Sequence, residues 1–436
     1  MGRFRLMLIG QRYGKYSPLL SPFHHKNRGL ATLLWRNARA WVHLRKPKPK
    51  REDMKGKVLA INTGSTSTKV GYYVDGNTVL VRNLELSAQE VLRFDSVLEQ
   101  GDLRKGIVMD FLRDAGVGLG DIDIVMARGG LFAPAVTGVY SVNADMREVL
   151  LSGRDGVHAC NLSAVIADDI AAEATAYRRE RGIGGPACFA YVADPPMADE
   201  MLPECHVGGL PDFPRRAFFH ALNSRAVVRR YLREHGHPTN DITAIVAHMG
   251  GGITVTLHRN GQVIDTNNGL GGDGPFTPER AGSCPAFPLI EMCFRSGLSE
   301  REVKHRVLGR GGAVAFFGTN DLRELERRAA ADPKVDTWLD AFGLNVAKYI
   351  ASLATTVDGK VDVILLTGGI AKDSRIVSDI RRRTAFIAPV EAYPGENELD
   401  SLAENGYLIL AGSAKIHRYD KNRLLEEEET VKVIRS

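Results

Sequence analysis

The segment Val58-Leu59-Ala60-Ile61 is a short apolar run, and it leads directly into the polar segment Asn62-Thr63-Gly64-Ser65-Thr66-Ser67-Thr68-Lys69. Residues 70–74 form a second apolar run, which the turn pair Asp75-Gly76 separates from residues 78–81. This order predicts a strand, a polar loop, and two further strands that a hairpin turn connects.

The same order returns at position 245, which is 187 residues after position 58. It consists of Ile245-Val246-Ala247-His248, Met249-Gly250-Gly251-Gly252, residues 253–257, Asn260-Gly261 and Val263-Ile264. A repeat at this spacing is too long for a solenoid and indicates two homologous domains that face each other. Helical patterns at 158–180, 217–234, 321–331 and 335–357 alternate with the strands and favour an α/β fold.

Both polar loops join strand to strand, whereas a Walker A loop or a Rossmann fingerprint joins a strand to a helix. The one G-x-G-x-x-G, at Gly269, Gly271 and Gly274, precedes Pro275 and Pro278, so we interpret it as a chance match. Hydroxyl and backbone N–H groups of two facing loops can donate to phosphate oxygens; two ordinary hairpins are the alternative. A third turn, Thr367-Gly368-Gly369-Ile370, follows the apolar run 363–366 and suits contact with a base or ribose.

Composition excludes several classes of protein. The 436 residues are 44% hydrophobic and 25% charged, and no run approaches the ~20 apolar residues that cross a bilayer. Five scattered cysteines without a C-x-x-C pair argue against a disulfide framework or a zinc ribbon, and favour a reducing cytoplasm.

The positive charge is concentrated in residues 1–53, which hold 13 Lys and Arg against two acidic residues. Since the whole chain carries +5, the remainder carries 5 − 11 = −6, which gives no electrostatic signature of nucleic-acid binding. We interpret residues 1–53 as a disordered leader or as translation from a spurious upstream start, with Met54 as the working first residue. An organellar address is the alternative.

The three loops resemble the nucleotide-binding loops of the acetokinase family, within the superfamily of acetate and sugar kinases, chaperone ATPases and actin. The resemblance extends from Lys57 to about residue 420 and is closer to butyrate kinases than to acetate kinases. The deciding segments are Ala127-Arg128-Gly129-Gly130-Leu131, Asp194-Pro195-Pro196-Met197-Ala198-Asp199-Glu200-Met201, Phe219-His220-Ala221-Leu222-Asn223 and Asp273-Gly274-Pro275-Phe276-Thr277-Pro278-Glu279-Arg280-Ala281-Gly282.

This resemblance implies two duplicated actin-like (ribonuclease H-like) domains around a nucleotide cleft, one of residues 54–205 plus 395–436 and one of residues 206–394. It implies reversible phosphoryl transfer from ATP to butanoate, giving butanoyl phosphate and ADP. A carboxylate is already ionised at pH 7, so catalysis would consist of positioning and charge neutralisation. A kinase for acetate, propionate or a branched acid, and an actin-like nucleotide switch without transfer activity, are the alternatives.

The resemblance also implies the site residues. The implied catalytic residues are Arg128, Asp194, His220, His248 and Arg280. The implied nucleotide-binding residues are Asn62, Gly64, Ser65, Ser67, Lys69, Gly250, Gly251, Gly252, Gly368, Gly369 and Ile370. Mg²⁺ is expected at Asn62 and Glu398, with Glu396 as the alternative carboxylate.

Simpler roles stay open for some of these residues: surface positions for the two arginines, and a core position for His220. His248 ends the first strand of the second repeat, so the repeat alone already predicts its place at the cleft. The expected partners are ATP or ADP, a short-chain carboxylate and its acyl phosphate, in a cytoplasmic homo-oligomer that binds neither nucleic acid nor membrane.

Overall fold

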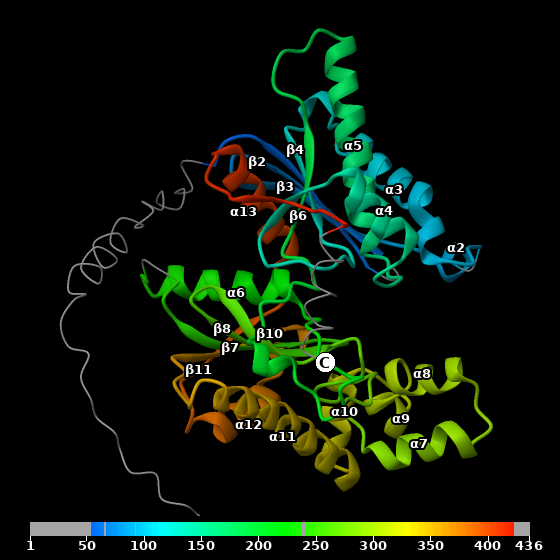
Figure 1. Cartoon of the computed structure of the whole chain (residues 1–436), viewed down its shortest axis with the longest axis vertical. Coiled ribbons are helices and arrows are strands. Elements are labelled where there is room, and N and C mark those ends of the chain that lie inside the picture. The colour runs from blue at the N-terminus through cyan, green and yellow to red at the C-terminus, as the bar shows by residue number, and fades with distance from the viewer. Residues whose placement is uncertain (1–53, 65–66, 92, 238–239, 423–436) are drawn as a thin grey trace, which may run out of the picture. The chain divides into compact units, whose positions relative to one another are not determined.

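The computed structural model of the chain describes residues 54–64, 67–91, 93–237 and 240–422 (Figure 1). The predicted leader, residues 1–53, and the predicted phosphate-loop residue Ser65 lie outside the described residues. Helices and strands alternate along the described chain, and the strands form two mixed β-sheets. This arrangement confirms the α/β class.

The first sheet has seven strands in the order β12-β5-β6-β4-β1-β2-β3. Their bounds are β1 (Lys57–Thr63), β2 (Ser67–Val74), β3 (Asn77–Glu85), β4 (Ile124–Arg128), β5 (Val139–Ser141), β6 (Phe189–Ala193) and β12 (Ile416–Arg418). β1 is antiparallel to β2, as the hairpin signal predicts, and parallel to β4. β12 brings the C-terminal segment back to the first sheet, beside β5.

Side chains of β1 alternate between two cores, because successive residues of a strand point to opposite faces. Leu59 and Ile61 lie in the core beneath α5 (Asn161–Glu180), and Val58 and Ala60 lie in the core beneath α13 (Glu398–Leu410). The other helices of this half are α2 (Ala88–Val91), η3 (Val97–Gln100), α3 (Gly101–Asp114), η4 (Leu119–Asp121) and α4 (Ala144–Ser152).

The second sheet has five strands in the order β11-β10-β7-β8-β9. Their bounds are β7 (Thr243–Met249), β8 (Ile253–Arg259), β9 (Gln262–Thr266), β10 (Val363–Gly368) and β11 (Val390–Pro394). β7 is antiparallel to β8 and parallel to β10, which repeats the pairing of β1 with β2 and β4. The duplication that the sequence predicts is therefore present in the strand pairing.

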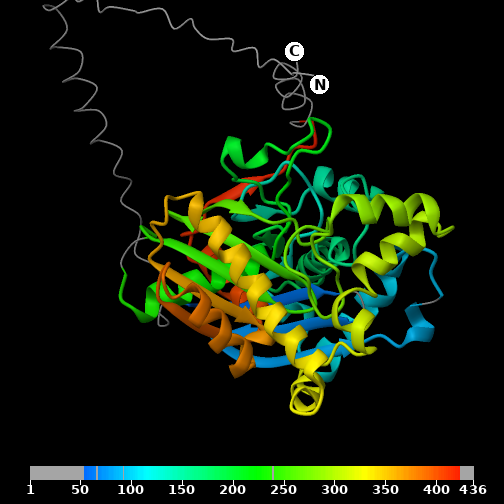
Figure 2. The same cartoon turned by 90° about the horizontal axis from the view of Figure 1, so that it is seen from below.

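Helices cover both faces of the second sheet. α6 (Ala221–Glu234) packs on one face, and α11 (Pro333–Thr355) with α12 (Ser374–Thr384) covers the other (Figures 1 and 2). The remaining elements are η5 (Pro203–His206), α7 (Ala286–Arg295), α8 (Glu300–Leu308), α9 (Gly312–Phe317), α10 (Leu322–Ala329) and η6 (Gly369–Lys372). The four predicted helices correspond to α5, α6, α10 and α11. In the described part of the chain, no helix is both long and apolar enough to cross a membrane.

Candidate functional site

Three of the predicted residues meet at the carboxyl ends of β1 and β4. Asn62 lies near the end of β1, Arg128 is the last residue of β4, and Glu398 is the first residue of α13. Asn62 Nδ2 donates to Glu398 Oε2, and Arg128 Nη1 lies 3.6 Å from the same oxygen. The Glu398 carboxylate raises the pKa of Arg128, so the guanidinium stays charged.

Asn62 offers an oxygen at this point. It is 4% exposed, and its Oδ1 is a buried acceptor without a hydrogen-bond partner. Among the described residues, no group of three or more His, Cys, Asp or Glu side chains is arranged to hold a metal ion. One or two hard protein oxygens with waters and phosphate oxygens suit Mg²⁺, so Asn62 and Glu398 fit that ion.

Glu396 contacts different residues from those that Glu398 contacts. Its Oε2 pairs with Lys69 Nζ at 3.0 Å, and its Oε1 lies 3.8 Å from His248 Nε2. Burial raises the pKa of Glu396, but the charge and hydrogen bond of Lys69, together with smaller contributions from neighbouring groups, outweigh burial and lower the pKa overall. The two carboxylates that the sequence leaves interchangeable are therefore distinguished by their neighbours.

His220 and His248 form a stacked pair, with ring centroids 3.9 Å apart. His248 Nδ1 lies 3.1 Å from Asn223 Oδ1, and His220 Nδ1 lies 2.9 Å from Thr254 Oγ1. Burial lowers the pKa of both imidazoles, and the neighbouring ring lowers that of His220 further. Both rings are therefore neutral near pH 7.

Each glycine loop is closed by a backbone hydrogen bond, which spans three residues in the first loop and two residues in the second. Gly64 N donates to Ser67 O at 2.8 Å, and Gly250 N donates to Gly252 O at 3.1 Å. In the first loop, Arg104 Nη1 also donates to Ser67 O, at 3.2 Å. Arg104 is fully buried and lies outside every motif of the sequence.

Arg280 lies against the second glycine loop. Its Nη1 donates to Gly269 O, and a Cβ atom on Gly252 would lie only 2.8 Å from Nη1. Thr277, three residues earlier, donates from Oγ1 to Gly251 O at 2.7 Å. The absence of a side chain at position 252 thus lets the guanidinium approach the backbone of the loop.

The third loop contacts the end of β7. Gly368 has φ of +88°, and a Cβ there would lie 2.3 Å from Met249 O, so the position requires glycine. Gly368 and Gly395 exchange two backbone hydrogen bonds of 3.2 and 3.0 Å. The contact of Gly368 with Met249 places the third loop beside the start of the second loop. The hydrogen bonds with Gly395 place it beside the segment that contains Glu396. A Cβ on Gly369, by contrast, would meet no atom within 4 Å.

Asp194 follows β6 and belongs to a separate ion cluster. Its Oδ1 lies 3.1 Å from Arg225 Nε, and its Oδ2 lies 3.4 Å from Arg229 Nη1. Gly138 N donates to Oδ1 at 3.0 Å. Asp194 is 2% exposed, and its carboxylate neutralises two arginines of α6. Among the described residues, no contact joins this carboxylate to Arg128 or to the two histidines.

His158 is a neighbour of the site that sequence reasoning missed. Burial, with the charges of Arg128 and Arg280, lowers its pKa to about 4. Cys160 N donates to His158 Nδ1 at 3.2 Å, which leaves the proton on Nε2. Its segment carries no recognisable spacing, so only the fold reveals that His158 lies near both arginines.

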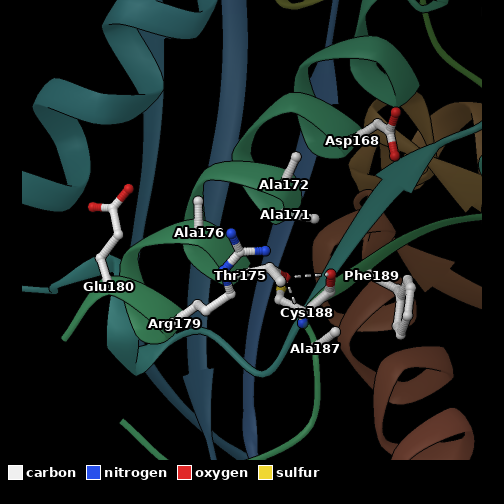
Figure 3. A pocket seen from close by; sticks show the side chains of 10 residues that line it. All are labelled: Asp168, Ala171, Ala172, Thr175, Ala176, Arg179, Glu180, Ala187, Cys188 and Phe189. Carbon is white, nitrogen blue, oxygen red and sulfur yellow. Dashed lines mark hydrogen bonds between the residues drawn. The ribbon is translucent and has the colours of Figure 1, made fainter. Parts of the chain in front are cut away.

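A pocket on the first half of the molecule is distinct from this site. It lies between the C-terminal half of α5 and the start of β6 (Figure 3). Its lining includes Thr175, Cys188 and Phe189, and it contains none of the predicted site residues.

Comparison with known proteins gives consistent matches. The family model described as the acetokinase family matches residues 213–411. Butyrate kinase 1 of Clostridium acetobutylicum is 40% identical over 364 residues, which cover 83% of this chain and 99% of that protein. A probable butyrate kinase of Bacteroides thetaiotaomicron is also 40% identical, with the same coverage.

Solved structures agree on the fold. The crystal structure of Porphyromonas gingivalis acetate kinase superposes with a TM-score of 0.64 at 18% identity, covering 81% of this chain and all of that chain. The acetate kinase of Entamoeba histolytica gives a TM-score of 0.62 at 17% identity, covering 80% and 98%. The predicted actin-like architecture is thereby confirmed.

Proposed function

The chain belongs to the acetokinase family, and from this premise we propose that it transfers the γ-phosphoryl group of ATP reversibly to the carboxylate of butanoate. The observation that carries the proposal is the 40% identity to butyrate kinase 1 over nearly the whole of that protein. The products are butanoyl phosphate and ADP. The enzyme is thus a phosphotransferase with a carboxyl group as acceptor.

The nucleophile requires no general base, because a carboxylic acid is ionised at neutral pH. The obstacle is repulsion between the carboxylate and the phosphates, which a fixed cation overcomes. We assign the carboxylate of the acid to Arg128. The contact with Glu398 supports this assignment, because it orients the guanidinium at the end of β4.

We assign the transferring phosphoryl group to Arg280 and the histidine pair. A guanidinium offers two parallel donors to phosphoryl oxygens, and Arg280 lies against the second glycine loop. His220 can donate from Nε2, because the hydroxyl of Thr254 lies 2.9 Å from Nδ1 and can satisfy that nitrogen. As neutral rings, the histidines serve as hydrogen-bond donors and leave the cationic role to the arginines.

The glycine loops would hold the remaining phosphates with backbone N–H groups. Gly64, Ser67 and Lys69 belong to the first loop, and Gly250, Gly251 and Gly252 belong to the second. Gly368, Gly369 and Ile370 would contact the adenosine. The open space beside Gly369 supports this role.

We propose that Asn62 Oδ1 and the Glu398 carboxylate hold Mg²⁺, directly or through its waters. The buried Oδ1 without a partner supports this proposal. When bound, Mg²⁺ neutralises phosphate charge in the transition state. Asp194 would act on the reaction through the arginines of α6. We likewise propose a cytoplasmic homo-oligomer whose subunits consist of one domain of residues 54–205 plus 395–436 and one domain of residues 206–394.

The decisive experiment is trapping of the acyl phosphate as a hydroxamate, with protein begun at Met54, ATP and Mg²⁺. Acetate, propionate, butyrate, isobutyrate and valerate are compared, since one methylene discriminates by only about 1–3 kcal/mol. We expect the highest kcat/KM at four or five carbons. A maximum at acetate would favour the alternative acid, and ATP binding without product from any acid would favour a nucleotide switch.

A further inference from the structure

Arg104 occupies a position of α3 where an apolar residue would be expected. The buried residues of α3 are Arg104, Val108, Phe111 and Leu112, and their spacing places all four on one face of the helix. Val108, Phe111 and Leu112 belong to the core beneath α5, as an amphipathic helix requires. Arginine keeps its charge in proteins, so α3 carries a cation into the interior, and desolvation of this cation is costly.

The hydrogen bonds of Arg104 direct its guanidinium toward the first glycine loop. Nε and Nη2 both donate to Gln100 Oε1, at 3.0 and 2.9 Å. Nη1 donates to Ser67 O and to Thr68 Oγ1, each at 3.2 Å. Gln100 is 2% exposed and lies one helical turn before Arg104. One edge of the guanidinium is therefore held by the start of α3, while Nη1 holds the end of the loop.

Ser67 O is a shared acceptor at the base of this loop. It accepts from Gly64 N, in the bond that closes the loop, and from Arg104 Nη1. A carbonyl oxygen has two lone pairs, so these two donors fix its direction. A carbonyl turned toward the cleft would repel phosphate, and Arg104 keeps this one turned toward the interior. The positive charge then lies one hydrogen-bonded oxygen away from Gly64 N.

The charge of Arg104 also reaches the rest of the candidate site. Burial lowers the pKa of His158 to about 4, and the charges of Arg128, Arg280 and Arg104 add to this effect. Arg104 is thus a third cation whose field acts at the point where Arg128 and Arg280 act. In the interior, a fixed charge interacts with an anion more strongly than it would in water.

Arg178 is a buried arginine of the same half of the fold that lies away from the loops. It is 7% exposed, donates to Gly120 O and Ile122 O, and pairs with Asp123 Oδ1 at 2.8 Å. These partners directly precede β4, whereas Arg128 is the last residue of β4. Arg178 therefore makes similar contacts with backbone carbonyls at the opposite end of the strand, and it provides a matched control.

We propose that Arg104 is a positioning residue for the nucleotide phosphates. It holds the carbonyl of Ser67 away from the cleft and supplies a fixed positive charge behind the first glycine loop. Because its side chain is fully buried, it acts through the loop and not by contact with the nucleotide. This inference rests on the proposed function, in which the first loop holds phosphate groups.

The first test substitutes Gln100→Glu, which separates the charge of Arg104 from its hydrogen bonds. A glutamate keeps the acceptor for Nε and Nη2, but its carboxylate cancels the charge of the guanidinium. Affinities for ATP, ADP and adenosine are measured by titration calorimetry in the presence of Mg²⁺. We expect the Kd of ATP and ADP to rise on the order of ten-fold, with that of adenosine unchanged. The melting temperature should not fall, because the loop stays in place.

The second test compares Arg104→Met with Arg178→Met, since both remove a buried guanidinium. We expect Arg104→Met to raise the Kd and the KM of ATP at least as much as Gln100→Glu does, with the KM of butanoate unchanged. Arg178→Met should be less stable than wild type but should bind ATP with wild-type affinity. A merely structural role of Arg104 would instead give the two methionine variants the same profile.

Unchanged ATP affinity in Gln100→Glu would overturn the role of the charge, and so would an equal loss of affinity for adenosine. Unchanged ATP affinity in a folded Arg104→Met protein would overturn the whole inference. Hydroxamate formation is measured on the same samples. If wild type binds ATP but makes no acyl phosphate from any acid, the proposed function fails, while the nucleotide affinities still decide the role of Arg104.

Discussion

The imidazole ring of His220 stacks on that of His248, with planes inclined by 14° and centroids 3.9 Å apart. His220 precedes α6 and His248 lies near the end of β7, so the contact joins the two elements that begin the second half of the fold. Two protonated rings at this distance would repel strongly. The pair is therefore built to remain neutral during the reaction.

This pair predicts the pH dependence of the reaction. Because burial lowers the pKa of both imidazoles below 6.5, the midpoint of neither titration lies between pH 8 and pH 6.5. We expect kcat/KM with saturating Mg²⁺ to show no inflection from the histidine pair over that interval and to fall at lower pH. The measurement is the pH profile of hydroxamate formation. An inflection near pH 7 that disappears in His220→Asn would contradict the prediction.

Stability should depend on pH through His258. This ring is 2% exposed, and burial with the charges of Arg225 and Arg229 lowers its pKa to about 3. The unfolded chain binds a proton here below pH 6.5 and the folded chain does not, so stability falls as the pH drops from 6.5 toward 3. The slope from this group approaches about 1.4 kcal/mol per pH unit. Urea unfolding of His258→Gln at pH 7 and pH 5 should show a smaller loss than wild type, and an equal loss would refute this assignment.

Arg280→Ala should lower the rate of transfer strongly while leaving nucleotide binding largely intact. The guanidinium would stabilise charge that develops during transfer, and removal of one such donor costs on the order of 10²–10³ in kcat. Arg323→Ala is the control, because this side chain is 86% exposed and lies on α10. Steady-state kinetics and ATP titration of both variants provide the measurement. Full activity of Arg280→Ala would end the assignment.

Glu398 and Glu396 should respond differently to neutralisation. Glu398 shares its oxygen with Asn62 and Arg128, whereas Glu396 pairs with Lys69. We expect Glu398→Gln to raise the half-activating Mg²⁺ concentration on the order of ten-fold, and Glu396→Gln to change it little. Mg²⁺ titration of activity distinguishes them. The reverse order would assign the metal to Glu396.

Asp194→Asn should destabilise the fold. Loss of this carboxylate leaves Arg225 and Arg229 without their shared counter-charge, which costs about 3–5 kcal/mol for a buried pair. Arg225→Met should cost less, because Arg229 still neutralises Asp194. Urea unfolding of the two variants is the comparison. A stable Asp194→Asn protein without activity would instead support direct contact with the reacting groups.

Alanine substitutions at the two adjacent glycines of the third loop should have different effects on stability. Gly368→Ala combines a φ of +88° with a Cβ 2.3 Å from Met249 O, so it should lower stability by about 1–3 kcal/mol. Gly369→Ala meets open space and should leave the melting temperature unchanged. If adenosine lies there, Gly369→Ala raises the KM for ATP. Equal melting temperatures for the two variants would show that the Gly368 backbone relaxes.

Much of the fold was predictable because it rests on local patterns. The run from Val58 to Ile61 and its repeat from Ile245 to His248 have the length and apolar content of buried strands, and the turn pairs Asp75-Gly76 and Asn260-Gly261 specify hairpins. The structure contains both hairpins. The resemblance of the loops then identified the family, which the comparisons confirm.

The side-chain partnerships were not predictable in the same way. Nothing in the spacing of Gly395-Glu396-Asn397-Glu398 decides which acid meets Asn62, and no motif marks His158 or Arg104. These contacts depend on how α13 and the segment before α5 return to the ends of β1 and β4. The ion pairs of Asp194 with Arg225 and Arg229 likewise join residues that are far apart in the sequence.

The sequence by itself thus determined the strands, the duplicated hairpins, the glycine loops and the family, because each depends on residues close together in the chain. Only the tertiary structure decided which carboxylate meets which cation, where the histidines stack and which buried arginine lies behind the first glycine loop. Those relationships join residues far apart in sequence, and their free energy depends on distance and burial, which no local pattern of residues encodes.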